Sequence, residues 1–544
     1  MLCRLLLGAA ALLAPLAQAL AQAAGAAESL PSFAELEALG AVIGEIRVNP
    51  QSIFDLDDPR ENNFLFRLAN RLHVHTKPGV IAKQLLFKQG DTVSVRAIEE
   101  TERLLRGNHY LHDVEIRPVA YRDGIVDIEV RTHDTWSLDP GLSYARAGGV
   151  GSSRLYATEH NFLGSGVTLG LARSSNVNRA GTELTFADAH ALGEWTGISG
   201  SVASLTDGSQ YALSVARPFY SLDARWAAGA SLSHSDALNS LYEKGEVIAQ
   251  YRSRQEGADL SAGWSTGLQS GFVRRYSLGF SHQSSEYALE SGAMPPQFLP
   301  ADMQLSGPYV RFELIEDAYE KVKNRDHIER PEYYAMGFQS RLQLGRSMST
   351  FGSTQDSWNY AASIGKGFRS FGTNTLLTSA SLASRYHDGH RENQMLGASA
   401  RYYAPHGERW LFSAALNADL ARQPDTPAPL TLGGDNGLRG YPLSYQSGER
   451  RVLMSLEERV YTDWYPFRLL RVGGAVFMDV GRAWHGTGQQ TAGQRALSDV
   501  GFGLRLQNSR AAFGSVLHID LAFPLHAPDD IRSMQILVKS HASF

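Results

Sequence analysis

The sequence contains a single cysteine, Cys3, among 544 residues, so it can form neither an internal disulfide nor a cysteine-ligated metal site. Basic and acidic residues nearly balance, at 51 against 56, which leaves no basic footprint for nucleic acid. After the N-terminus no apolar run is as long as a membrane-spanning helix requires, and the mean hydropathy is −0.24. These absences exclude a disulfide scaffold, a nucleic-acid binder and a helical membrane protein.

Catalytic motifs are also missing. The sequence has no Gly-x-Ser-x-Gly elbow, no His-Glu-x-x-His pair and no phosphate-binding glycine loop. His73 and His75 would face one way on an extended segment, but without a third ligand nearby they are expected to be surface residues. The charged stretch 320–327 is expected to be a solvated turn or loop. We therefore expect no enzyme activity, no catalytic residues, no metal site and no cofactor.

Residues 1–23 are typical of a cleavable secretory signal. Arg4 precedes an apolar run over residues 5–16, and small residues follow at the positions that a signal peptidase prefers. The alternative, a buried N-terminal helix, is disfavoured because no acidic residue occurs before Glu28. Removal of the signal would take Cys3 with it and leave residues 24–40 as a leader. Export across an inner membrane follows from this interpretation.

Residues 41–136 predict a small α+β domain with the order β-α-α-β-β. The expected elements are a strand over 42–48, helices over 59–73 and 78–87, a helix from Ser94 to Arg106 ended by Gly107, and strands over 114–118 and 125–130. The last two strands are joined across Asp123-Gly124, a strong hairpin signal. The first helix carries an apolar stripe made of Phe64, Leu65, Leu68 and Leu72.

From residue 137 onward the apolar residues recur with a period of two. Between 513 and 523, for example, Ile519 and Leu521 alternate with His518 and Asp520, and similar alternation occurs over 502–507 and 472–480. One face of such a strand suits hydrocarbon and the other suits water. The 52 glycines and the 53 aromatic residues (22 Tyr, 23 Phe and 8 Trp) supply turns and interfacial side chains. This pattern predicts a transmembrane antiparallel β-barrel over residues 137–544.

Several short motifs resemble one superfamily. They are Asn161-Phe162-Leu163-Gly164-Ser165-Gly166, Arg217-Pro218-Phe219-Tyr220, Leu438-Arg439-Gly440-Tyr441, Ser455-Leu456-Glu457, Phe477-Met478-Asp479-Val480-Gly481 and the terminal Phe544. In this order they resemble the superfamily of the outer-membrane assembly factor BamA, its relative TamA and the transporters of two-partner secretion. Segments 85–91, 100–106 and 110–111 give the domain at 41–136 a likeness to one POTRA module. The resemblance covers essentially the whole mature chain.

The resemblance implies a barrel of sixteen strands, although our count of regular runs also fits 18 or 20. It implies that the loop bearing Gly437, Leu438, Arg439, Gly440 and Tyr441 folds into the lumen as a latch. Phe544 resembles the terminal aromatic residue of an insertion signal. The protein is then expected in the outer membrane, with the POTRA-like domain in the periplasm.

Strand parity supports partners for Arg439. Asp479 alternates with apolar neighbours on its strand, and Glu457 does the same on the preceding one, so both carboxylates should face inward. A guanidinium can bind a carboxylate through two parallel hydrogen bonds. The alternative is an exposed loop whose arginine is solvated.

Two classes of function remain open at this point. The first is assembly of outer-membrane proteins or translocation of polypeptide, with unfolded clients, outer-membrane lipids and accessory assembly proteins as partners. Its seam would join the first strand, 138–146, to the last, 534–544, and would be weakly paired because Pro140 and Gly141 interrupt the first. The second class is a passive channel or an enzyme-bearing barrel, although the sequence shows no nucleophile and base for the latter. Dedicated secretion of one partner protein is a further alternative.

Overall fold

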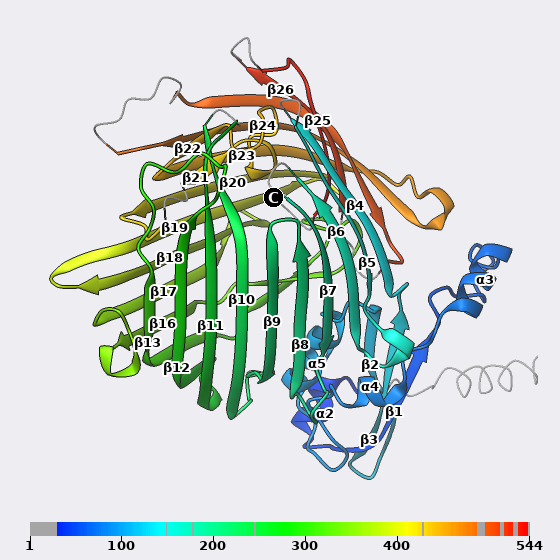
Figure 1. Ribbon diagram of the computed structural model, residues 1–544. Helices are drawn as coiled ribbons and strands as arrows, with labels where there is room; N and C mark the ends of the chain where they lie inside the picture. Colours follow the sequence, from blue (N-terminus) through cyan, green and yellow to red (C-terminus); the bar gives the residue numbers. More distant parts are fainter. Residues whose placement is uncertain are drawn as a thin grey trace, which may run out of the picture.

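The computed structural model describes residues 30–147, 150–176, 179–243, 246–426, 429–486, 495–511, 516–525 and 531–541. The expected signal, residues 1–23, and the expected insertion-signal residue Phe544 lie outside these ranges. A small N-terminal α+β domain lies against one end of a large β-barrel (Figure 1). We call the barrel end beside this domain the proximal end and the opposite end the distal end. Among the described residues, no helix is long and apolar enough to cross a membrane.

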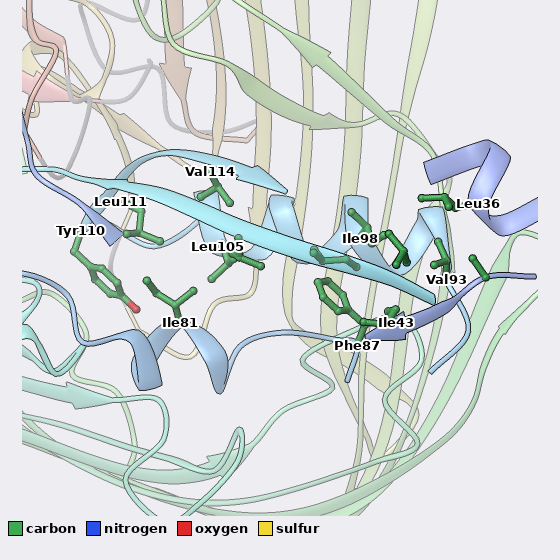
Figure 2. Close-up of a cluster of buried hydrophobic side chains, with 14 residues drawn as sticks. Leu36, Ile43, Ile81, Phe87, Val93, Ile98, Leu105, Tyr110, Leu111 and Val114 are labelled. Carbon is green, nitrogen blue, oxygen red and sulfur yellow. The ribbon is translucent and has the colours of Figure 1, made fainter. Parts of the chain in front are cut away.

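The N-terminal domain is a three-stranded sheet covered by helices. Its elements are α2 (Phe33–Ala38), β1 (Val42–Gln51), α3 (Phe64–Leu72), α4 (Pro78–Ala82), α5 (Val95–Arg106), β2 (Leu111–Arg122) and β3 (Ile125–Asp134). The sheet order is β1-β3-β2, with β1 parallel and β2 antiparallel to the central strand. Aliphatic side chains from the helices and the sheet form its core, as Figure 2 shows. The predicted α+β class is confirmed.

Local signals explain most of these boundaries. The Ser94 side chain accepts a hydrogen bond from the backbone of Ala97 at the start of α5, and Gly107 ends that helix. Asp123 and Gly124 both adopt positive φ, as a tight hairpin turn between β2 and β3 requires. Helix α2 is an addition, because it lies in the segment expected to be a leader, and its Leu36 is fully buried in the core.

Within the described part of the chain, the barrel closes through twenty strands. They are β4 (Leu138–Ala147), β5 (Val150–Glu159), β6 (Thr168–Ser175), β7 (Ala180–Asp188), β8 (Gly197–Leu205), β9 (Gly208–Arg217), β10 (Trp226–Glu243), β11 (Glu246–Gln269), β12 (Phe272–Leu289), β13 (Met303–Glu316), β16 (Gln339–Ser347), β17 (Ser357–Ser370), β18 (Asn374–His387), β19 (His390–His406), β20 (Trp410–Arg422), β23 (Arg450–Tyr461), β24 (Leu470–Trp484), β25 (Leu497–Asn508), β26 (Val516–Leu525) and β27 (Gln535–His541). Sixteen is therefore too low, and the largest alternative applies. The runs that exceeded sixteen are the regular strands β7, β8, β19 and β20.

The strands have the two faces that their sequences predict. On β24, Val476 and Met478 are exposed on the outer surface, whereas Phe477 and Asp479, which alternate with them, are buried on the luminal face. The outer wall is thus apolar, as contact with lipid requires. The polar residues line the lumen, and some of them form the candidate site.

The seam between the first and last strands has few hydrogen-bonded residue pairs. Among the described residues, β27 pairs with β4 at three positions: Ile536 with Arg146, Leu537 with Ala145, and Val538 with Tyr144. The same strand pairs with β26 at seven positions, and β4 pairs with β5 at ten. Closure of the barrel therefore depends on a short ladder.

Candidate functional site

A long loop, residues 423–449, enters the lumen from the distal end. Strand β4 starts at the proximal end and the strands alternate in direction, so β20 ends at the distal end and the loop begins there. The loop contains the short strands β21 (Leu430–Leu432) and β22 (Gln446–Gly448) and the 3-10 helix η3 (Gly434–Asn436). Leu438, Arg439 and Tyr441 are almost completely buried. The expected solvated alternative for Arg439 therefore does not apply.

Arg439 binds two strands of the barrel wall at once. Its Nε lies 2.7 Å from Asp479 Oδ2 and its Nη2 lies 3.0 Å from Asp479 Oδ1, a bidentate pair. Its Nη1 lies 3.4 Å from Glu457 Oε2. The guanidinium also stacks on Phe477, with its carbon 3.3 Å from the ring centroid. The structure brings together Arg439 and both carboxylates that strand parity placed in the lumen.

Further charged residues extend this cluster across β25 and β26. Asp520 Oδ2 accepts a hydrogen bond from Arg439 Nη1 at 3.1 Å, and Asp520 also pairs with Arg505. Glu457 Oε1 accepts from Arg505 Nη2 at 2.9 Å and from Arg459 Nε at 3.0 Å. These side chains are all buried. We call Arg439, Glu457, Arg459, Asp479, Arg505 and Asp520 the latch cluster.

Gly437 and Gly440, on either side of Leu438 and Arg439, require glycine for different reasons. Gly437 has a φ of +115°, and a Cβ there would meet a Leu453 side-chain carbon at 2.0 Å. Gly440 has no positive φ. Instead its backbone N–H donates to Asp499 Oδ2 at 2.9 Å, and a Cβ there would meet the Asp499 Cβ at 2.6 Å. Close approach, rather than conformational freedom, explains Gly440.

Apolar contacts fix the rest of the loop. Leu438 and Tyr441 pack with Leu432, Leu453 and Ala483 in a buried cluster. The Tyr441 hydroxyl donates to backbone carbonyls at the distal ends of β25 and β26, at 3.2 and 3.1 Å. The loop is therefore held by packing as well as by charge. Burial of this many ions is costly unless every one is paired, so the cluster should be sensitive to the loss of a single partner.

A second insert, residues 317–338, enters the lumen from the proximal end between β13 and β16. It contains the hairpin of β14 (Tyr319–Val322) and β15 (Glu332–Ala335). The carbonyl of Arg325 accepts hydrogen bonds from Arg459 Nη1 at 2.8 Å and from the Tyr461 hydroxyl at 3.0 Å. The expectation that 320–327 is a solvated loop is wrong for Arg325, which is buried. We call this insert the proximal hairpin.

The proximal hairpin also contacts the N-terminal domain. Lys321 Nζ lies 3.0 Å from Glu102 Oε1 on α5, and the Arg103 guanidinium lies 3.9 Å from the centre of the Tyr319 ring. The hairpin thus connects α5 to the latch cluster through Arg325 and Arg459. The pKa of the Glu102 carboxyl is lowered, because the Lys321 and Arg106 cations outweigh the effect of burial.

A separate contact joins α5 to the turn before β10. Glu100 accepts a hydrogen bond from the Leu222 backbone at 2.8 Å, and Arg96 pairs with Asp223. Burial raises the pKa of Glu100 above its usual value. The domain is therefore attached to the barrel at more than one position.

One of the two histidines considered as metal ligands, His73, differs from the expectation that both are surface residues. The His73 side chain is only 3% exposed, and its Nε2 lies 2.8 Å from Asp134 Oδ2 at the end of β3, whereas His75 is exposed. The donor atoms of these three residues lie within 4.8 Å of one another. Asp134 is 61 residues from His73, so spacing in the sequence could not reveal it.

Sequence reasoning missed Arg505, Asp520 and Arg459 as members of the latch cluster. A signal for the first two existed, because Arg505 and Asp520 each alternate with apolar residues and so belong on the luminal face. Nothing in the sequence indicated which of the many luminal ions would meet the loop. Asp499 was missed for the same reason, although it lies directly opposite Asp479 in the ladder between β24 and β25.

A closed barrel with an apolar outer wall, a polar lumen and a folded-in loop defines a β-barrel protein of the outer membrane. Residues 161–537 match the Omp85 superfamily domain. The chain belongs to the Omp85 superfamily, and the predicted resemblance is confirmed.

Solved structures resemble the chain only distantly. BamA from Haemophilus ducreyi lacking POTRA domains 1–3 has 14% identity and a TM-score of 0.38, over 92% of this chain and 84% of that one. CdiB from Escherichia coli has 14% identity and a TM-score of 0.48, over 92% and 76%. The FrpB iron transporter from Neisseria meningitidis has 9% identity and a TM-score of 0.39, over 92% and 93%. No curated protein matches the chain.

Proposed function

We propose that this protein inserts polypeptides into the outer membrane, or passes them across it, by parting the seam between β4 and β27. The observation that carries the proposal is the three-position ladder at that seam in a barrel whose other strands pair at length. Parting three pairs exposes two strand edges, and an exposed edge can pair with a client strand. No covalent bond is made or broken, so the proposed action needs no catalysis.

The latch cluster supports lateral opening. It ties the loop to β23, β24, β25 and β26, the strands that precede β27. These strands therefore form a braced unit on one side of the seam, and β27 is the part of that side outside the brace. A strand that leaves from this edge would not have to break an ion pair of the cluster.

The two inserts argue against the alternative of a passive channel. The loop at 423–449 enters from the distal end and the proximal hairpin from the other, and β23 holds both, because Glu457 binds Arg439 of the loop and Arg459 binds the Arg325 carbonyl of the hairpin. A permanently open pore has no use for two inserts bound to the same stretch of its wall. Dedicated secretion of one partner protein through the lumen would require both to move.

The N-terminal domain fits the role of a client receptor in the periplasm. Its sheet order leaves β1 and β2 as edge strands, so an extended segment can add to the sheet. Unfolded outer-membrane or secreted polypeptides are the proposed clients, with accessory assembly proteins as further partners. Protease added to intact cells should spare residues 41–136, and cleavage there would contradict this placement.

A disulfide across the seam tests the mechanism. Ala145→Cys with Leu537→Cys joins directly paired positions of β4 and β27, where Cα atoms are close enough for a disulfide. The matched control, Ala145→Cys with Ser152→Cys, shares one cysteine but locks β4 to β5, which stay together when the seam parts. Both variants are placed in lipid vesicles, and insertion of a urea-denatured small barrel protein is followed by protease protection.

The seam variant should fail when oxidised and recover when reduced, while the control works in both states. Equal insertion by the oxidised and reduced seam variant would show that the seam stays closed. Translocation through the lumen would then be the better explanation.

A further inference from the structure

Helix α3 has one face that holds it to its own domain. Phe66 stacks on Phe54 with ring centroids 4.0 Å apart, and the Asn70 side chain exchanges two hydrogen bonds with the Phe54 backbone, at 2.9 and 3.1 Å. Asn63 caps the helix by accepting from the backbone of Phe66. These contacts fix both the position and the rotation of α3.

The opposite face of α3 is apolar and uncovered. The sequence-based stripe, which would ordinarily face a core, instead leaves four large side chains exposed: Phe64 at 70%, Leu65 at 69%, Leu68 at 38% and Leu72 at 64%. Residues spaced by three and four positions share a side of the helix, so these form one patch rather than scattered contacts with water. A contiguous patch of this kind marks an interaction surface.

The patch borders the lipid-facing wall of the barrel. An apolar cleft of about 1100 Å³ lies between them, lined by Phe64, Leu65 and Ala69 from the helix and by Leu142, Leu517 and Val538 from β4, β26 and β27. The cleft therefore opens at the seam. Figure 1 shows α3 apart from the other helices of the domain, beside the barrel rather than beneath it.

A neighbouring turn adds to the same surface. Phe467 is 81% exposed, lies in the turn between β23 and β24 at the proximal end, and also lines the cleft. Trp464 of that turn is exposed as well. Aromatic side chains at the rim of a barrel are typical of the interface between lipid and water.

The segment before α3 is bound to the barrel, and this fixes the position of the helix along the barrel axis. Arg510, in the turn between β25 and β26, pairs with Glu61 and donates to the Ile53 carbonyl at 3.1 Å. The Arg510 carbonyl accepts from the Trp136 backbone at 2.8 Å. Beside the apolar patch, Arg67 and Arg71 lie on the adjoining side of α3 and are exposed, so they can meet lipid phosphates.

We propose that α3 is an amphipathic membrane anchor that lies in the proximal leaflet directly beside the seam. Its apolar face enters the acyl region, Arg67 and Arg71 meet anionic headgroups, and an acyl chain occupies the cleft. The occupant is phospholipid because the patch continues the lipid-facing wall of the barrel and is bordered by cations. The inference depends on the barrel spanning the membrane, and not on the proposed transport.

Site-specific labels in the full-length protein test the anchor. Leu68→Cys carries an environment-sensitive fluorophore, and the protein is placed in vesicles of phosphatidylethanolamine and phosphatidylglycerol without any client. One quencher is a lipid whose acyl chain bears a nitroxide near the headgroup, and the other is aqueous iodide. The matched control is Leu39→Cys, because Leu39 is also an exposed leucine of this domain, at 63%, but lies after α2.

The label at Leu68 should lose most of its fluorescence to the nitroxide lipid and little to iodide, and the label at Leu39 should show the reverse. Both positions are exposed, so the substitutions should not disturb folding, and heat-modifiable migration of the barrel checks this. Equal iodide quenching at both positions overturns the proposal. Protection of Leu68 that develops only after an unfolded client is added would also overturn it and assign the patch to the client.

Discussion

Backbone pairing between neighbouring strands is sparse at the seam and extensive in the wall that contains β10, β11 and β12. β10 and β11 pair at eighteen positions, whereas β4 and β27 pair at three among the described residues. Each backbone hydrogen bond contributes about 0.5 to 1.5 kcal/mol net, so the difference amounts to many kcal/mol. A barrel with one short ladder has a defined place to open, and the long wall keeps the rest closed.

The two sides of the seam differ as well. Before the seam, the latch cluster binds β23, β24, β25 and β26 through buried ion pairs. After it, β4 to β9 are strands of eight to ten residues. The side before the seam is braced in the lumen, and we expect the short strands after it to yield more easily.

Amide hydrogen exchange tests the difference between the seam and the long wall most directly. Amides of β27 and β4 should exchange orders of magnitude faster than those of β10 and β11, because opening three pairs costs far less than opening eighteen. The measurement is exchange of the folded protein in lipid nanodiscs, read by mass spectrometry of peptides. Slow exchange at both places would remove the basis for lateral opening.

Loss of Arg439 should have the next largest effect. Arg439→Ala leaves Asp479 buried without its cation and removes one of two cationic partners from Asp520 and one of three from Glu457, which costs about 3 to 5 kcal/mol. Urea unfolding and heat-modifiable migration would measure the loss.

Arg154→Ala is the control for Arg439→Ala. Arg154 on β5 pairs with Glu183 on β7 at 2.9 Å, and both side chains are partly exposed. That pair should contribute less than about 1 kcal/mol. If the two variants lose equal stability, the latch cluster is no stronger than a surface ion pair and does not brace the strands before the seam.

Some of this comparison could be predicted from the sequence and some could not. Parity placed Asp479 and Glu457 in the lumen because a strand alternates its side chains strictly. The resemblance supplied the loop that meets them. Burial of Arg325 could not be predicted, because the proximal hairpin has no periodicity that distinguishes a luminal insert from a solvated loop. The exposed stripe of α3 was predicted as a stripe, but whether it faces protein or lipid depends on where the barrel lies.

The number of strands shows the same limit. The extra strands were visible as regular runs, and the structure places β7, β8, β19 and β20 in the wall. The family likeness implied sixteen, and local pattern could not decide between the values. Closure is a property of the whole sheet, because an added pair of strands changes the circumference of the barrel without changing any one strand.

A smaller effect should follow from crowding the latch loop. Gly440→Ala places a Cβ 2.6 Å from the Asp499 Cβ and 3.0 Å from the Pro524 nitrogen, and both are held by the wall. The loop must shift, at a cost of about 1 to 3 kcal/mol. Gly365→Ala on β17 is the control, since its Cβ would meet only the Thr378 carbonyl at an ordinary 3.5 Å. Equal urea midpoints for both variants would mean that the loop is not tightly seated.

The proximal hairpin offers the smallest and most specific test, because it links the N-terminal domain to the braced strands. Lys321→Ala removes the pair with Glu102, whereas Arg369→Ala removes a pair with Glu320 of the same hairpin that does not reach the N-terminal domain. The Lys321 and Arg369 side chains are both largely exposed, so each change should lower the free energy of unfolding by less than about 1 kcal/mol.

The two variants should differ in the position of the N-terminal domain instead. Distances between spin labels on α5 and on β17 should broaden for Lys321→Ala and stay narrow for Arg369→Ala. Identical distributions would show that the contacts of Glu100 and Arg96 with the turn before β10 hold the domain without help from the hairpin.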